Sequence, residues 1–257
     1  MGYFTVKVTP DLVDGTVAKI IQSDKTDLPF GAEDILFDWT AFDVPKGTCA
    51  LHSITMYMMG EDGATQTDAD FWFVFAKSID GTAPSTLGVV NAAQTACFDL
   101  PKFLIGSLKV EASQGGSGQL KGPAFGNIVH WGMAGSGGDM GPVILEGEPE
   151  SGTNVGYDKI YVAAFTGANI DFSTGVLSTG AVSAEASATI AVDTVDPRKC
   201  FQVGDTVYVH DVDTAAGTVA SLGSGSIVLN AVTAAAVANN DELVNANPIK
   251  IVFGFEK

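Results

Sequence analysis

The residues best suited to chemistry in this chain are its three histidines, which could serve as general bases or metal ligands. His52, His130 and His210 each lie in a strand-like segment, and no two of them share a short spacing. The sequence contains neither the HExxH pair of zinc proteases nor the GxSxG turn of serine hydrolases. A triad would have to assemble from residues far apart in the chain. We therefore interpret each histidine as a structural residue and predict no catalytic residue.

Carboxylates form two groups that could bind a hard cation such as calcium, whose ligands are carboxylate and carbonyl oxygens. The first group comprises Glu61, Asp62, Asp68 and Asp70, and the second comprises Asp205, Asp211 and Asp213. Neither group matches the calcium loop DxDxDG, and chance grouping is expected with 30 acidic residues. Solvated surface is the favoured interpretation, so we predict no metal.

Glycine-rich loops also provide no sign of a cofactor site. The run at 135–141 lacks the GxGxxG spacing, and no phosphate-binding loop ending in Gly-Lys-Ser or Gly-Lys-Thr occurs. We interpret these glycines as flexible loops and predict no cofactor.

Large aromatic side chains are the remaining candidates for a binding surface. Trp39, Trp72 and Trp131 could form a platform on which sugars stack, but each lies on a strand among apolar neighbours. Packing in the core or at a subunit interface is therefore the favoured interpretation.

Composition excludes several classes of partner. Lys and Arg number 13 against 30 Asp and Glu, a formal charge of −17, and Arg198 is the only arginine. Such an acidic chain repels a phosphate backbone, so we predict no nucleic-acid partner. No run approaches the roughly 18 apolar residues that span a bilayer, and residues 1–8 alternate like a strand rather than a signal peptide. We expect no membrane partner and a soluble protein made in a cytoplasm.

The cysteines indicate buried thiols rather than a metal or redox site. Cys49, Cys97 and Cys200 lie far apart and form no CxxC pair, so at most one disulfide could form. We favour free, buried thiols.

The elements that must position these residues are strands. Apolar and polar residues alternate at 35–41 and 50–59, and further strand-like segments occur at 104–112, 127–133, 142–146 and 159–165. No helical pattern longer than about ten residues is convincing. The sequence predicts an all-β fold, a jelly-roll-like β-sandwich of two sheets.

A change of composition near Ser178 indicates a second unit. Aromatic residues almost disappear up to Asn247, and short strands are expected at 188–192, 206–209, 217–220, 226–229 and 242–244. Five such strands fit a small SH3-like or OB-like β-barrel. Residues 248–256 return to the earlier aromatic composition, so we predict that a barrel at 181–247 is inserted into a sandwich formed by 1–180 plus 248–257. The alternative is a plain C-terminal domain.

The segment 71–75 is apolar on both faces, which predicts a central strand covered on both sides. Phe71, Phe73 and Phe75 would face one way, and Trp72 and Val74 the other. Because a two-layer sandwich covers only the inner face of a strand, the outer face needs a loop such as 113–126, the barrel, or a second subunit. We expect a homo-oligomer, with a trimer favoured over a dimer.

Segments 201–209, 217–221 and 226–230 are similar to small barrel modules of the capsid and tail proteins of tailed bacteriophages. Together with the acidic, glycine-rich sandwich, they make the chain resemble a virion structural protein, especially of phages of marine bacteria. The resemblance implies a non-enzymatic part of the particle, assembled in the host cytoplasm, that binds other virion proteins. A capsid decoration protein bound to the major capsid protein is the first choice.

Two alternatives remain open. One is a tail or fibre component that binds carbohydrate and recognises a receptor. The other is a polysaccharide-active enzyme, which the scarcity of arginine and histidine disfavours because an acidic polysaccharide requires cationic groups.

Overall fold

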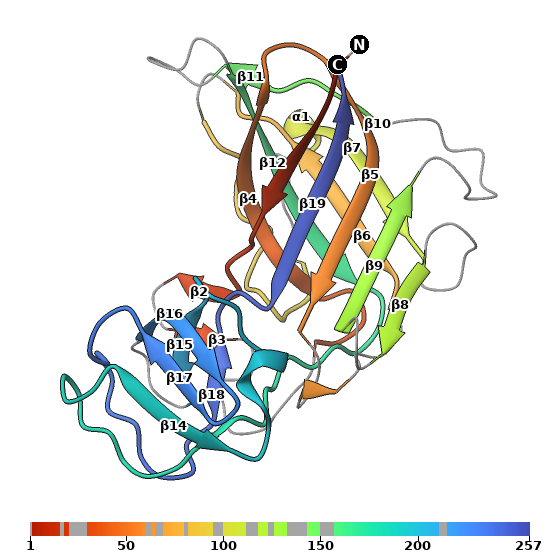
Figure 1. The fold of residues 1–257 in the computed structure, drawn as a ribbon. Coiled ribbons are helices and arrows are strands. Elements are labelled where there is room, and N and C mark those ends of the chain that lie inside the picture. The colour runs from red at the N-terminus through yellow and green to blue at the C-terminus, as the bar shows by residue number, and fades with distance from the viewer. Residues whose placement is uncertain are drawn as a thin grey trace.

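The computed structural model describes residues 2–15, 18–20, 30–59, 63–64, 69–79, 82–94, 100–111, 118–122, 126–132, 143–149, 157–210 and 215–257. Over these residues the chain is all-β, as predicted (Figure 1). The one α-helix among them is the short α1 (Leu100–Phe103), which leads directly into a strand.

The first sheet of the sandwich is antiparallel and contains both ends of the chain. Its strand order is β1 (Tyr3–Val8), β19 (Ile249–Glu256), β5 (Cys49–Met58), β9 (Gly126–Gly132) and β8 (Gly118–Gly122). The short β10 (Val143–Leu145) pairs with β5 as well. β8 lies within residues 113–126, which the sequence led us to treat as a loop, so that interpretation was wrong for 118–122.

The second sheet is built around β12 (Tyr157–Thr166). This strand lies between β4 (Ile35–Pro45) and β6 (Phe71–Ala76), and β7 (Leu104–Val110) pairs with the far side of β6. The two-residue β11 (Glu148–Pro149) also pairs with β12. β4 and β5 follow one another in the chain but belong to opposite sheets, which fixes the two layers relative to each other.

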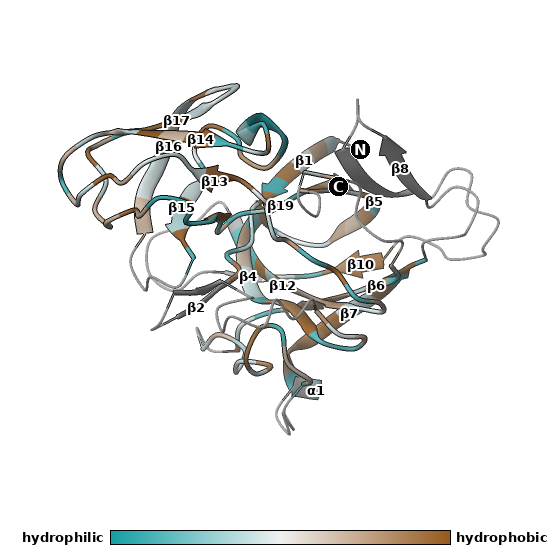
Figure 2. Ribbon diagram, turned by 90° about the horizontal axis from the view of Figure 1, so that it is seen from below, coloured by the Kyte–Doolittle hydropathy of each residue, from teal (hydrophilic) through white to brown (hydrophobic). Residues whose placement is uncertain are grey.

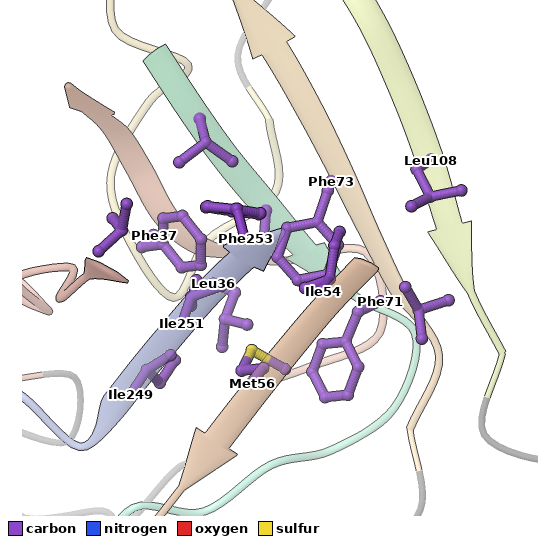
Figure 3. Packing of buried hydrophobic residues seen from close by; sticks show 14 of the residues in the cluster. Leu36, Phe37, Ile54, Met56, Phe71, Phe73, Leu108, Ile249, Ile251 and Phe253 are labelled. Atoms are coloured by element: carbon purple, nitrogen blue, oxygen red, sulfur yellow. The ribbon is translucent and has the colours of Figure 1, made fainter. Parts of the chain in front are cut away.

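The core between the two sheets is rich in phenylalanine (Figure 3). Phe71, Phe73 and Phe75 are fully buried there, as the alternation in β6 predicted. The ring of Phe253 on β19 lies 5.7 Å from that of Phe75 and 5.4 Å from that of Phe42, measured between centroids. The last strand is thus packed against the same core as strands from the first third of the sequence.

A third, nearly closed sheet forms the small barrel. Its order is β13 (Leu177–Ser178), β14 (Thr189–Asp193), β17 (Ser226–Leu229), β16 (Ala215–Gly223), β15 (Thr206–Val209) and β18 (Leu243–Asn245). A bridge between Leu177 and Glu242 brings the first and last strands together. The 3-10 turn η2 (Pro197–Lys199) precedes β15, and the separate hairpin β2 (Val13–Gly15) and β3 (Ala18–Ile20) follows β1.

The barrel lies beside the sandwich rather than between its sheets (Figures 1 and 2). It has its own apolar core, and its first strand starts at Leu177, slightly before the expected boundary at 181. After the barrel the chain returns to the sandwich as β19, which pairs with β5 on one side and with β1 on the other. The predicted pairing of 249–255 with strands that precede residue 180 is therefore confirmed, while the division into independently folding units stays a prediction.

Candidate functional site

The outer face of β6 is the surface for which the sequence required a cover, and the chain provides part of that cover itself. Val74 packs beside the buried Ile35, Leu87 and Ala163. Leu87 belongs to residues 82–94, a connecting segment that we did not expect in this role. A segment of the same chain therefore contributes to the cover that we had assigned to a loop at 113–126, the barrel or a second subunit.

The covering segment 82–94 is fastened to β4 by hydrogen bonds. Asn91 N–H donates to the Ile35 carbonyl at 3.0 Å, and Thr86 Oγ1 donates to Asp38 Oδ2 at 2.6 Å. The indole Nε1 of Trp39 donates to the Ser85 carbonyl at 2.9 Å. Trp39 therefore packs and anchors, as the favoured interpretation of the tryptophans predicted.

Trp72 is different, because it remains half-buried beside an open groove. The groove has a volume of about 780 Å³. Its lining comes from the outer faces of β6, β7 and β12, the end of the covering segment and the turn before β4. The residues include Trp72, Val74, Ser107, Lys109, Phe165, Gln94 and Glu33. We call it the Trp72 groove. In the sheet register Trp72 lies between Phe165 and Lys109, so an apolar strip borders polar side chains.

The Trp72 indole is held from two directions. Lys109 Nζ lies 5.2 Å from the ring centroid, a cation–π distance. A Cβ placed on Gly167 would lie 2.7 Å from Trp72 Cζ3, so the indole edge rests against a backbone that only glycine allows.

Lys109 is itself fixed by two carboxylates. Its Nζ lies 2.9 Å from Asp70 Oδ2 and 3.0 Å from Glu111 Oε1. Hydrogen bonds to Asp70 first and Glu111 second raise the pKa of Lys109 above its usual value. The ammonium is therefore charged at neutral pH.

Glu33 stands at the edge of the Trp72 groove in an unusual conformation. Its φ is 71°, in the left-handed region that disfavours side chains other than those of Gly, Asn and Asp. Its N–H donates to the Thr166 carbonyl at 2.6 Å, which ties this turn to the end of β12.

The predicted histidines are not brought together. His52 on β5 places Nε2 2.8 Å from Glu256 Oε2 and packs edge-on against Tyr3, beside a shallow pocket of about 310 Å³. His210 follows β15 in the barrel, where its N–H donates to the Glu242 carbonyl. The backbone of His130, like that of Trp131, lies in β9, and their side chains lie outside the described residues.

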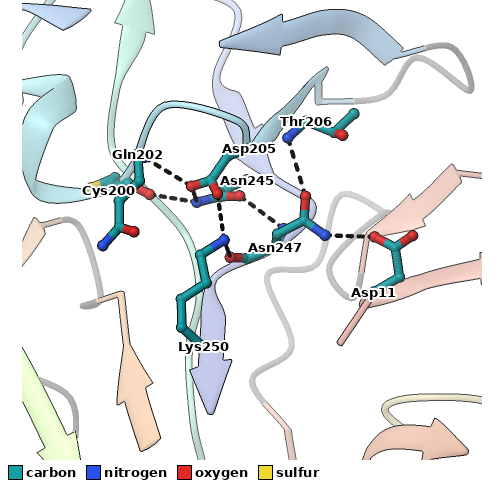
Figure 4. A network of polar contacts seen from close by, with 8 residues as sticks. All are labelled: Asp11, Cys200, Gln202, Asp205, Thr206, Asn245, Asn247 and Lys250. Carbon is teal, nitrogen blue, oxygen red and sulfur yellow. Dashed lines mark hydrogen bonds and ion pairs between the residues drawn. The ribbon is translucent and has the colours of Figure 1, made fainter. Parts of the chain in front are cut away.

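The carboxylates of the two predicted groups are also not brought together in the described residues. Asp70 contacts Lys109, and Asp205 lies in a polar network with Lys250 and Asn245 (Figure 4). The other predicted members, Glu61, Asp62, Asp68, Asp211 and Asp213, lie outside the described residues. Over the described part of the chain, no three His, Cys, Asp or Glu side chains gather as metal ligands would.

Two of the three cysteines are free and buried, as expected. These are Cys49 on β5 and Cys200 in the barrel, while Cys97 lies outside the described residues. Burial raises the pKa of the Cys49 thiol to about 11, so this sulfur stays protonated and unreactive at neutral pH.

The sequence indicated Trp72 but not the residues around it. Glu33, Gln94, Ser107 and Lys109 come from separate segments that only the sheet register and the covering segment bring together. The outward direction of Trp72 in the 71–75 alternation was the one available signal.

In the described residues, no helix has the length and apolar character needed to cross a membrane.

Comparison with known proteins found no matching protein family, no matching curated protein and no matching solved structure.

Proposed function

We propose that the chain is a non-enzymatic structural protein of a bacteriophage particle, acting as a decoration protein that binds and stabilises the head shell. The resemblance of the barrel segments to phage modules is the starting point, and the two-part fold agrees with it. The observation that carries the proposal is the attachment of the barrel to the sandwich.

This attachment is a buried polar network (Figure 4). Lys250 on β19 forms an ion pair with Asp205 in the barrel, and Asp205 is only 1% exposed. Asp205 also accepts hydrogen bonds from Asn245 Nδ2 and the Gln202 N–H, both at 2.8 Å. Lys250 Nζ donates to the Asn247 carbonyl at 2.9 Å.

The network extends to the N-terminal segment of the sandwich. Asn247 Nδ2 donates to Asp11 Oδ1 at 2.8 Å, and Asn247 Oδ1 accepts from the Thr206 N–H at 3.1 Å. These contacts favour one orientation of the two parts. A preferred orientation suits a protein that must bind shell subunits at set positions, because less orientational freedom is lost on binding.

Binding to shells is the direct test. Purified chain should sediment with capsid shells of the virus that encodes it, and mass spectrometry should find it in purified virions. Lys250→Met should weaken sedimentation, because it loosens the barrel without changing the outer surface. Absence from virions together with no binding to shells would contradict the proposal.

Self-association belongs to the same proposal, and we place it at the edge strand β1 rather than at Trp72. Among the described strands β1 pairs with β19 alone, and its Tyr3 is 77% exposed. An unpaired edge can pair with another chain. Closed symmetry at a shell position favours a trimer.

Light scattering separates the two candidate contacts. The wild-type chain should have the mass of a trimer, Tyr3→Ser should shift it towards monomer, and Trp72→Ser should leave it unchanged. A chain that is monomeric at micromolar concentration, alone and when mixed with shells, would remove this part of the proposal.

A further inference from the structure

We propose that the Trp72 groove is a binding site for a neutral saccharide chain. The site is a different surface from the β1 edge and from the barrel attachment. Its occupation therefore does not depend on whether the chain is part of a virion.

The apolar strip of the groove suits the carbon face of a sugar ring. Trp72 and Phe165 are half-buried neighbours across two paired strands, and Val74 lies beside them. The axial hydrogens of a pyranose form a flat apolar face, which buries well against an aromatic ring. A groove of about 780 Å³ is within the range of small-ligand sites and has room for more than one ring.

The platform is ordered before any ligand arrives. Lys109 over the ring and Gly167 at its edge limit the positions of the Trp72 indole. Lys109 is in turn held by Asp70 and Glu111. Pre-ordering reduces the entropy lost on binding, which favours a ligand that offers only weak stacking contacts.

Hydrogen-bonding groups border the strip on separate elements. Gln94, Ser107 and Glu33 are all exposed and line the groove. An amide, a hydroxyl and a carboxylate together accept and donate hydrogen bonds, as sugar hydroxyl groups require.

Charge determines which saccharide fits. Asp70 and Glu111 both contact the ammonium of Lys109, and Glu33 adds a third carboxylate to the groove. The whole chain carries −17. An anionic sugar would meet a negative potential, and among the described residues that line the groove no cation other than Lys109 could neutralise it. The groove therefore selects neutral hexose or N-acetylhexosamine chains over sialylated or sulfated ones.

The first experiment applies the purified full-length chain to an array of neutral hexose and N-acetylhexosamine oligosaccharides beside sialylated and sulfated ones. The best ligand is then measured by calorimetry. We expect binding to neutral glycans alone. Binding to no glycan, or only to acidic glycans, would overturn the proposal.

Variants then assign the binding to this groove. Trp72→Ala should weaken binding more than about tenfold, because it removes the stacking surface. Gln94→Ala should weaken it about threefold to tenfold, the value of one or two hydrogen bonds, and cannot disturb packing because Gln94 is exposed.

Gln202→Ala is the matched control for Gln94→Ala. Gln202 is also an exposed glutamine, but it lies in the barrel and does not line the groove. Its variant should bind as the wild type does. Neutral-glycan binding that survives Gln94→Ala and a folded Trp72→Ala unchanged would place the site elsewhere and overturn the proposal. A failure here leaves the virion proposal standing, because that is tested on particles.

Discussion

The sandwich and the barrel are built from different core residues. The sandwich core contains nine phenylalanines, whereas Phe201 is the one phenylalanine in the barrel core, which otherwise consists of valine, isoleucine, leucine, alanine and Cys200. Apart from the nine-residue β16, the barrel strands are also short, with four residues in β15 and β17, against ten or eleven in β4, β5 and β12 of the sandwich. A small closed sheet has little interior volume, so small branched side chains fill it better than rings.

The barrel also relies more on buried polar side chains. Thr174 Oγ1 donates to the Leu243 carbonyl, Ser178 Oγ to the Ala238 carbonyl and Thr233 Oγ1 to the Ala235 carbonyl. These bonds hold loops where strands are too short to pair extensively. The comparison teaches that long strands stabilise the sandwich through the apolar area they bury. The small barrel, in contrast, needs specific hydrogen bonds to define its loops.

Removing the barrel is the most severe test of this comparison. Its entry and exit lie side by side, since Thr174 Oγ1 donates a hydrogen bond to the Leu243 carbonyl. Deleting residues 176–243 and joining Gly175 to Val244 with Gly-Ser-Gly should therefore leave a soluble, β-rich sandwich. Calorimetry should show one unfolding transition where the whole chain has two. An insoluble or unfolded remainder would mean that the two cores form one cooperative unit.

Phe253→Ala should produce the next largest effect. Phe253 is fully buried, and its ring contacts those of Phe42, Phe73, Phe75 and Phe255. Truncation should cost about 4 kcal/mol from lost burial and the cavity that remains. In thermal unfolding, only the midpoint temperature of the sandwich transition should fall.

Phe201→Ala provides the control for Phe253→Ala. Phe201 is 1% exposed in the barrel core, so its truncation should lower the barrel transition instead. If either variant lowers the midpoint temperatures of both transitions equally, the two cores do not unfold separately.

Strand alternation explains how much of this fold the sequence could predict. The segments 50–59 and 71–75 correspond to β5 and β6, because period-two burial is a local property of a strand between a core and an outer surface. The segment 35–41 lies in β4, but its predicted alternation was wrong, because register shifts interrupt the strand and Ile35, Leu36 and Phe37 are all buried. The five expected barrel strands also lie in β14 to β18. The sixth, β13, has only two residues, too few for a periodic signal.

The Trp72 groove could not be predicted in the same way. Residues 82–94 contain no named strand or helix and are placed by individual bonds to Asp38, Trp39 and Ile35. Such contacts depend on which strands pair, so they leave no periodic pattern. Lys109 meets Trp72 only because β7 pairs with β6 in one register.

Lys250→Met tests the bond between the two regions at a smaller scale. Methionine keeps much of the apolar stem but leaves the buried Asp205 carboxylate without its cation. We expect a loss of about 3 kcal/mol, the lower part of the range for breaking a buried pair, because Lys250 is 23% exposed. Denaturant unfolding measures the loss.

Adding Asp205→Asn should recover part of that stability, because a neutral amide is less costly to bury than an unpaired carboxylate. A loss below about 1 kcal/mol in the single variant would identify an ordinary surface pair. It would also mean that this ion pair adds little to the attachment of the barrel.

The smallest effect concerns pH and a buried thiol of the sandwich. Cys49 Sγ lies 3.7 Å from the Leu145 carbonyl, and its pKa rises from 9.0 to about 11. Burial is the main cause, the nearby Asp158 adds to it, and Lys257 opposes it. In the unfolded chain the thiol ionises near pH 9, while in the folded chain it stays protonated up to about pH 11. Stability contributed by this group is therefore complete below pH 9 and is lost as the pH rises to 11.

Two pKa units correspond to about 2.7 kcal/mol. Denaturant unfolding of the wild type and of Cys49→Ala, both in a Cys97→Ser background, should measure this loss as a difference between pH 8 and pH 11. The wild type should lose more stability than the variant over that interval, because alanine has no proton to release. Tyr57 and Tyr208, whose pKa values are also raised by burial, contribute equally to both proteins and cancel in the comparison. Equal losses in the two proteins would mean that the thiol is already solvated in the folded sandwich, and that this edge of its core is open to water.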